Sequence, residues 1–277
     1  MRIGVCSWSL QPGSPDDLAR KAGECGLSSV QLALEPLLAG EWDLNETASV
    51  LRANGIQILS AMVQTKGEDY TTLNTIRQTG GLRPDEHWET NLALARRAAP
   101  MCTKFGIDLV TFHAGFMPHD TADPEFSLIR DRVLEFSQCF HDHGVRVALE
   151  TGQESAETLR FFLEQLRSDA IGVNFDPANM ILYGMGDPAD ALLLLYKHTY
   201  QIHLKDATQA HTPGEWGAET PVGRGHVDWT SLFETVAERH LNVDMCFERE
   251  AGDSRVRDIS DGLDYLMPLL KSAGAQI

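Results

Sequence analysis

The chain has 277 residues, 43% of them hydrophobic and 23% charged, which is typical of a water-soluble globular protein. Its 40 acidic and 23 basic residues give a formal net charge of −17, which opposes binding to a nucleic acid or an anionic membrane surface. The five cysteines are scattered, which favours neither a disulfide framework nor a thiolate metal site, so we expect a reducing cytoplasm. We find neither a signal-peptide core near the start nor a segment that approaches a membrane span.

Short apolar strands alternate with amphipathic helices eight times along the chain. Helix-start signals such as Ser14-Pro15, Asp123-Pro124 and Asp187-Pro188 follow several of the strands. Pro100 should kink or break the helix that begins at Pro84. We predict strands at residues 3–8, 30–35, 56–63, 107–113, 145–150, 171–176, 200–203 and 243–248.

Two polar segments, residues 64–83 and 207–227, are too long for ordinary connections. We expect them to be active-site loops that close over a substrate. No linker or low-complexity stretch interrupts the strand and helix count, so we take residues 1–277 as one domain.

The faces of the predicted strands distinguish between two α/β architectures. In residues 145–150, 171–176 and 243–248, one face is apolar and the opposite face is small or polar. An open sheet with helices on both faces should be apolar on both, whereas a closed barrel can carry a polar layer near its mouth. The pattern therefore predicts a single (β/α)₈ TIM barrel.

Four of the predicted strands end on a side chain that can bind a metal. These residues are Glu150, Asp176, His203 and Glu248, and parallel strands would place them side by side at one rim. Three carboxylates and one imidazole favour a single Mn²⁺, Mg²⁺ or Co²⁺ over a thiolate-type zinc site, although Zn²⁺ remains compatible. Any one acid alone could simply cap a helix, but four at corresponding positions favour a metal site.

Five other polar or aromatic residues are candidates for substrate binding. His113 ends the fourth strand and Trp8 ends the first. Instead of binding a substrate, His113 could be a histidine with its bonds satisfied in the interior, and Trp8 could belong to the core. Lys205 could reach a substrate oxygen or form a surface salt bridge. Arg224 and His226, in a glycine-flanked turn, could meet a phosphate or a hydroxyl or be merely solvated.

The segments "VALETGQE", "VNFDPANM", "IHLKDA", "GRGHVDW" and "CFERE" carry a family resemblance. With them, the sequence resembles the sugar phosphate isomerase/epimerase superfamily of xylose-isomerase-like barrels, which includes ketose 3-epimerases, inosose dehydratases and apurinic endonucleases. For the sugar enzymes, the resemblance implies one divalent ion held by the residues that match Glu150, Asp176, His203 and Glu248. In the ketose epimerases the two matching glutamates also move the proton.

The chain departs from the ketose 3-epimerases at three substrate contacts. Asn179 stands where they have a histidine, Gln209 where they have an arginine, and Ala156 where they have a substrate-binding glutamate. Asn179 also replaces an extra histidine that the endonucleases need for a metal cluster. Asn179 thus becomes a substrate-binding candidate of this chain, while ketose 3-epimerisation itself is left open.

These features together predict an isomerase or epimerase that acts on a keto-sugar or related polyol through an enediolate. Two carboxylates, Glu150 and Glu248, can serve as base and acid on opposite faces of that intermediate. The same site would suit a lyase that dehydrates a keto-inositol or keto-sugar, and a noncatalytic partner subunit is a further alternative. A small carbohydrate is the expected partner, and the sequence leaves open a homo-oligomer and whether the substrate is phosphorylated.

Overall fold

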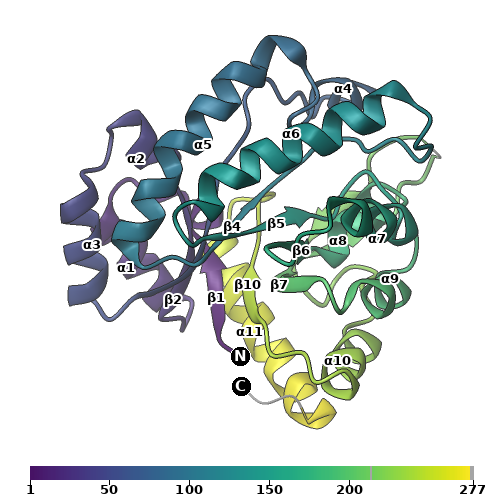
Figure 1. Ribbon diagram of the computed structural model, residues 1–277. Helices are drawn as coiled ribbons and strands as arrows, with labels where there is room; N and C mark the ends of the chain where they lie inside the picture. Colours follow the sequence, from purple (N-terminus) through teal and green to yellow (C-terminus); the bar gives the residue numbers. More distant parts are fainter. Residues whose placement is uncertain (213, 275–277) are drawn as a thin grey trace.

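The computed structural model describes residues 1–212 and 214–274, in which eight parallel strands close into a barrel with helices packed around it (Figure 1). Around the barrel the order is β1-β10-β7-β6-β5-β4-β3-β2. The barrel strands are β1 (Ile3–Cys6), β2 (Ser29–Ala33), β3 (Gln57–Met62), β4 (Leu109–Phe112), β5 (Arg146–Glu150), β6 (Ile171–Phe175), β7 (Thr199–Leu204) and β10 (Asp244–Phe247). The predicted TIM barrel is therefore confirmed.

The helices follow the strands and cover the outside of the barrel. Ser14, Asp123 and Asp187 each cap a helix whose first turn contains a proline, as their sequences predict. The helices are α1 (Pro15–Glu24), α2 (Glu35–Ala39), α3 (Leu44–Ala53), α4 (Leu73–Thr79), α5 (Asp85–Phe105), α6 (Pro124–His141), α7 (Ala156–Leu166), α8 (Pro177–Leu182), α9 (Pro188–Leu195), α10 (Trp229–Glu238) and α11 (Arg255–Ala273), with a 3₁₀ helix, η1 (Ser7–Leu10), after β1.

Several short elements differ from the predictions. The segment 64–83 contains helix α4. The segment 207–227 contributes to a two-stranded antiparallel sheet of β8 (Asp206–Thr208) and β9 (Ala218–Thr220). Helices α2 and α8 are too short to show a periodic apolar face. Pro100 lies inside α5 without breaking it, so the predicted break is wrong. Trp8 belongs to η1 rather than to the first strand.

The strand register brings the ends of neighbouring strands to one rim. Glu150 of β5 pairs with Asn174 of β6, two residues before Asp176. His203 of β7 pairs with Cys246 of β10, two residues before Glu248. Because all the barrel strands are parallel, the four predicted ligands come together at this carboxyl end.

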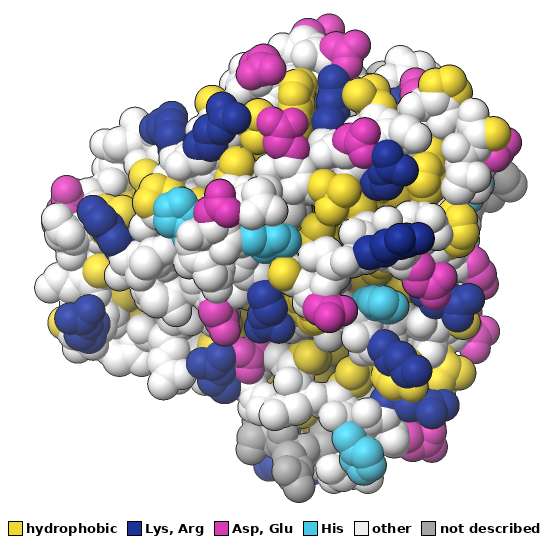
Figure 2. Space-filling view, in the orientation of Figure 1, with side chains coloured by type: hydrophobic (Ala, Val, Ile, Leu, Met, Phe, Trp, Pro, Cys, Tyr) yellow, Lys and Arg dark blue, Asp and Glu magenta, His cyan; other side chains and the backbone are white. Residues whose placement is uncertain are grey.

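The face of the molecule seen in Figure 2 carries charged side chains of both signs. On the face seen in Figure 2, basic and acidic side chains are interspersed, and no broad basic region appears there. Within residues 1–212 and 214–274, none of the helices is long and apolar enough to cross a bilayer.

Asp206 fixes the long segment after β7. Its buried carboxylate accepts hydrogen bonds from the backbone N–H groups of Gly223 at 2.9 Å and Val227 at 3.1 Å, and from Trp229 Nε1 at 3.1 Å. These three hydrogen bonds to one side chain hold the chain from Gly223 to Trp229 against the barrel. The end of this segment therefore has a defined conformation.

We expect Gly225→Ala to destabilise this segment, because an added Cβ would overlap Asp206 Oδ1 and lie 2.6 Å from the Ala207 carbonyl oxygen. The expected loss in the free energy of unfolding is about 1–3 kcal/mol. Gly13→Ala is the matched control, because a Cβ there meets nothing within 4 Å. Urea unfolding of both variants checks this, and equal stabilities would contradict the described position of Asp206.

Candidate metal centre

Four ionisable side chains meet at the carboxyl end of the barrel. Glu150, Asp176, His203 and Glu248 each offer one ligand atom, and these atoms lie within 4.8 Å of one another. All four residues are buried, with at most 5% of each exposed. Three carboxylates in so small a volume require positive charge, because buried like charges repel strongly.

His203 is oriented by a hydrogen bond behind the site. Its Nε2 lies 2.8 Å from Gln31 Oε1, while Gln31 Nε2 donates to Thr111 Oγ1 at 2.8 Å and so fixes which way the amide points. Nε2 is therefore turned toward Gln31 and Nδ1 toward the carboxylates. Nδ1 lies 3.1 Å from Glu248 Oε2 and 3.6 Å from oxygens of Glu150 and Asp176, which is the ring orientation that a metal-binding histidine needs.

Asp176 is both a helix cap and a ligand candidate. Its Oδ1 accepts a hydrogen bond from the backbone N–H of Asn179 at 3.0 Å, which begins α8. Its Oδ2 is completely buried and has no hydrogen-bond partner within the described part of the chain. An unpartnered buried carboxylate oxygen is costly, so this atom is suited to a cation.

Glu150 is held by two amide side chains. Asn179 Nδ2 donates to its Oε1 at 3.0 Å, and Asn174 Nδ2 donates to its Oε2 at 3.2 Å. His113 Nε2 lies 3.7 Å from the same Oε1. Burial favours the neutral acid, but His113 and His203 outweigh it and lower the pKa of Glu150.

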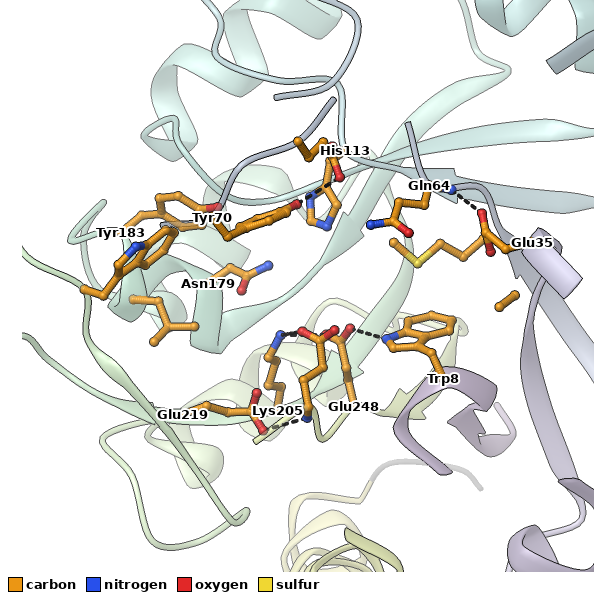
Figure 3. Close-up of a pocket in the computed structure, with 16 residues that line it drawn as sticks. Trp8, Glu35, Gln64, Tyr70, His113, Asn179, Tyr183, Lys205, Glu219 and Glu248 are labelled. Atoms are coloured by element: carbon orange, nitrogen blue, oxygen red, sulfur yellow. Dashed lines mark hydrogen bonds and ion pairs between the residues drawn. The ribbon is translucent and has the colours of Figure 1, made fainter. Parts of the chain in front are cut away.

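Glu248 is held from two sides. Trp8 Nε1 donates to its Oε1 at 2.8 Å, and Lys205 Nζ donates to its Oε2 at 3.0 Å (Figure 3). Although burial acts to raise the pKa of Glu248, Lys205 and His203 hold it well below its usual range. For Asp176, by contrast, burial is the largest effect and raises its pKa to about 6.

These residues fit one divalent cation. Asp176 Oδ2 lacks a partner, His203 presents Nδ1, and two glutamate oxygens complete a set of one nitrogen and three oxygen donors. Such a set suits Mn²⁺, Mg²⁺, Co²⁺ or Zn²⁺. The polar groups behind it, Gln31 and Asn174, hold the ligands in place as metal sites require.

A pocket of about 490 Å³, lined by Glu248 among these four residues, opens beside the site. In Figure 3, the rings of Tyr70 and Tyr183 lie across it from Trp8, and Asn179, His113 and Lys205 lie around the centre. A narrower hollow lined by Glu150, Glu154 and His113 adjoins it. The volume and the mixture of aromatic and polar walls suit a small polar molecule.

The structure brings together most of the predicted site residues. Trp8, His113, Asn179 and Lys205 all line the pocket with Glu248. Arg224 and His226 are exposed and lie outside it; Arg224 borders a separate surface hollow beside α11. His226 instead accepts a hydrogen bond from the Gln209 N–H at 3.3 Å. These two residues are therefore not part of the site proposed below.

Some residues of the site were missed from the sequence. Gln31 and Asn174 occupy inward positions of predicted strands, so their polar character on that face was an available signal. Tyr70 and Glu68 come from the long segment 64–83, and Trp216 and Glu219 from the segment 207–227. No local pattern indicates which residues of a long segment turn toward a pocket.

Comparison with known proteins agrees with this geometry. The chain belongs to the xylose isomerase-like TIM barrel family, whose model matches residues 18–269. A xylose isomerase domain protein from Planctomyces limnophilus is 29% identical, with a TM-score of 0.85 over 92% of this chain and 93% of that one. The uncharacterized protein YihM of Escherichia coli (strain K12) is 23% identical over 195 residues, which are 69% of this chain and 56% of YihM. The chain thus spans little more than half the length of that relative.

More distant solved structures share the fold. D-psicose 3-epimerase from Clostridium cellulolyticum H10, solved with D-tagatose, is 17% identical, with a TM-score of 0.72 over 98% of this chain and 99% of that one. The probable 3-DHS dehydratase AsbF from Bacillus anthracis is 16% identical (TM-score 0.74, 96% and 98% covered). A Mycobacterium smegmatis protein of the same fold, 18% identical, was solved in complex with magnesium (TM-score 0.75, 99% and 98% covered).

We predict that Asp176→Ala abolishes metal binding and leaves the barrel folded. Asp187→Ala is the matched control, because Asp187 also caps a helix that begins with proline but lies outside the site. The control should lose about 1 kcal/mol of stability and keep one ion per chain. Metal content after purification without chelator, together with circular dichroism, measures both effects; an Asp176→Ala protein with wild-type metal content would disprove the site.

Glu154 predicts a pH effect on stability. Burial raises its pKa to about 8, so between about pH 4.5 and 8 the folded protein holds a proton that the unfolded chain has lost. Glu154 therefore lowers stability as the pH rises through this range, and neutral Glu154→Gln removes that loss. The stability advantage of the variant should grow by roughly 1.4 kcal/mol per pH unit. Urea unfolding of the metal-free proteins between pH 5.5 and 7.5 tests this, and a constant difference would mean that Glu154 is already ionised when folded.

Proposed function

We propose that this protein is a divalent-metal-dependent isomerase or epimerase that acts on a keto-sugar or related polyol through an enediolate. The observation that carries the proposal is the buried set of Glu150, Asp176, His203 and Glu248, of which Glu248 lines a pocket with polar and aromatic walls and Glu150 lines the adjoining hollow. A carbon acid next to a ketone needs both charge stabilisation and a nearby base. This set can supply both.

A divalent ion, when bound, supplies a Lewis acid that stabilises negative charge on the carbonyl and adjacent hydroxyl oxygens of the substrate. Asp176 and His203 are best suited to hold it, because one is fixed by its helix cap and the other by Gln31. Glu150 and Glu248 also contribute ligand atoms. We assign the proton transfers to these two glutamates.

The two glutamates approach the pocket from different sides. Glu248 lines the main pocket beside Trp8 and Lys205, and Glu150 lines the adjoining narrow hollow beside His113. This arrangement supports one carboxylate on each side of a planar intermediate, with one acting as the base and the other as the acid.

The remaining wall residues are proposed to bind the substrate. Trp8 offers a flat apolar surface to a sugar ring, and His113 and Lys205 offer donors to its oxygens. Asn179 lines the pocket, and its Nδ2 already donates to Glu150 Oε1 and to the Thr151 carbonyl oxygen at 3.1 Å, so we assign it both the positioning of Glu150 and a contact with the substrate. The long segments 64–83 and 207–227 contribute Tyr70 and Trp216, which supports the proposal that they close over the substrate.

A dehydratase acting on a keto-inositol or keto-sugar is the second candidate. It would use the same ion and the same base but expel a hydroxide from the substrate. The structural likeness to the probable 3-DHS dehydratase supports it, and so do Ala156 and Gln209, where the ketose 3-epimerases have other residues. Product analysis separates the two candidates, since only the lyase releases a dehydrated product.

We predict that Glu150→Gln and Glu248→Gln keep much of their bound metal and lose activity by about 10²-fold or more, because the amide keeps an oxygen ligand but removes the base. Glu89→Gln, exposed on α5, is the control for the same substitution. Turnover in D₂O gives a second measurement, because proton transfer should place deuterium next to the substrate carbonyl.

A variant that still incorporates deuterium without completing turnover would show which carboxylate removes the proton. If both glutamine variants work near the wild-type rate with metal bound, the assignment is wrong. In that case His113 or Lys205 becomes the candidate base.

A further inference from the structure

The walls of the pocket are strongly acidic. Among the lining residues that the structure describes, Lys205 is the only lysine or arginine. The same wall contains the five glutamates Glu35, Glu68, Glu219, Glu248 and Glu250. A phosphate or carboxylate on a substrate is normally bound by arginine, lysine or free backbone donors, so the composition of this wall is unusual for an anionic ligand.

The charge of Lys205 is already balanced within the protein. Its Nζ donates to Glu248 Oε2 at 3.0 Å and to Glu250 Oε2 at 3.2 Å, and it lies 3.9 Å from Asp176 Oδ2. The lysine side chain is 5% exposed, whereas the Glu250 side chain is 53% exposed. Glu250 therefore stands between this cation and the solvent side of the pocket.

The neighbouring arginine is also engaged elsewhere. Arg249 donates to Glu219 Oε1 at 2.6 Å and to Asp258 Oδ2 at 2.9 Å, and it does not line the pocket. Glu219 accepts further hydrogen bonds from the backbone N–H groups of Glu250 and Ala251. These donors, which could have bound an anionic group, instead hold Glu219 and position Glu250.

The other wall residues suit hydroxyl groups and ring faces. Glu35 and Glu68 offer carboxylate oxygens that accept hydrogen bonds from hydroxyls. Tyr183 and Trp216 pack edge to face, with ring centroids 4.8 Å apart, and form an aromatic wall. Acceptors and aromatic surfaces without a free lysine or arginine among the described lining residues match an uncharged, hydroxyl-rich molecule.

Building on the function proposed above, we infer that the substrate is an uncharged keto-sugar or cyclic keto-polyol. Glu250 is the specificity-determining residue, because it compensates Lys205 and so denies an anionic group the one lysine of the wall. Apart from His113 and the proposed metal ion, phosphorylated and carboxylated analogues meet only glutamates and neutral side chains. Specificity here comes from a repulsive element as well as from fit.

The test uses matched pairs of ligands and two separate measurements. Unphosphorylated ketopentoses, ketohexoses and an inosose are each paired with their phosphate esters, and binding to the metal-loaded protein is measured by calorimetry. Deuterium incorporation from D₂O is measured on the same pairs. The neutral member of at least one pair should bind about 10²-fold more tightly than its ester.

The outcomes separate this inference from the proposed function. Neutral sugars that bind but exchange no deuterium and yield no dehydrated product support the inference and overturn the function. Esters that bind and exchange better than their neutral partners overturn the inference and support the function. A panel in which no neutral compound binds more tightly than its ester also overturns the inference.

Two variants test the role of Glu250. Glu250→Gln frees the charge of Lys205, so the ratio of ester to neutral affinity should rise about 10-fold or more, and less at high salt. Glu250→Asp keeps the charge and should keep a ratio near that of the wild type. Glu89→Gln, which makes the same change outside the pocket, should leave the ratio unaltered. If Glu250→Gln keeps the wild-type ratio, Glu250 does not determine specificity.

Discussion

The site is governed by the cost of burying three carboxylates together. Glu150, Asp176 and Glu248 place oxygens within 4.8 Å of one another where almost no water reaches. Lys205 and the donors around the two glutamates compensate part of this charge, but Asp176 Oδ2 has no hydrogen-bond partner in the described chain. A divalent cation at this point resolves the repulsion, so metal binding and the integrity of the site are linked.

This constraint explains why the interior of the barrel is polar below the metal site. Gln201 donates to Asn174 Oδ1 at 3.2 Å, and Asn174 donates to Glu150, so the glutamate rests on a chain of amides. Gln201 Oε1 in turn accepts from Ser60 at 2.5 Å. A buried polar network stabilises a fold only when its members are satisfied, and these residues satisfy one another. The barrel core thereby positions Glu150 through hydrogen bonds, which apolar side chains could not form.

The barrel and the four ligand candidates could be predicted from the sequence because both follow from local patterns. Alternation along each strand and capping signals such as Asp123-Pro124 define the units, and Glu150, Asp176, His203 and Glu248 all come at strand ends. The position of Arg224 and His226 could not be predicted in this way. Their segment is held by Asp206 through bonds to Gly223, Val227 and Trp229, which are long-range contacts that leave no periodic signal. Helix α4 was missed for a related reason, since a short polar helix has little apolar periodicity.

The contacts of the two glutamates also make them chemically unequal. Glu248 accepts from the ammonium of Lys205 and from Trp8, and the pKa of Glu248 is held well below its usual range. Glu150 accepts from neutral amides, with His113 at 3.7 Å, and its pKa is lowered less strongly. A carboxylate bonded to a permanent cation is the weaker base, so in the proposed reaction Glu150 is the better acceptor of a carbon-bound proton. Glu250 reduces this difference because it shares the charge of Lys205. Glu248 is therefore more basic than it would be if Lys205 were bonded to Glu248 alone. The residue that we infer to select uncharged substrates therefore also affects the basicity of Glu248, one of the two groups to which we assign proton transfer.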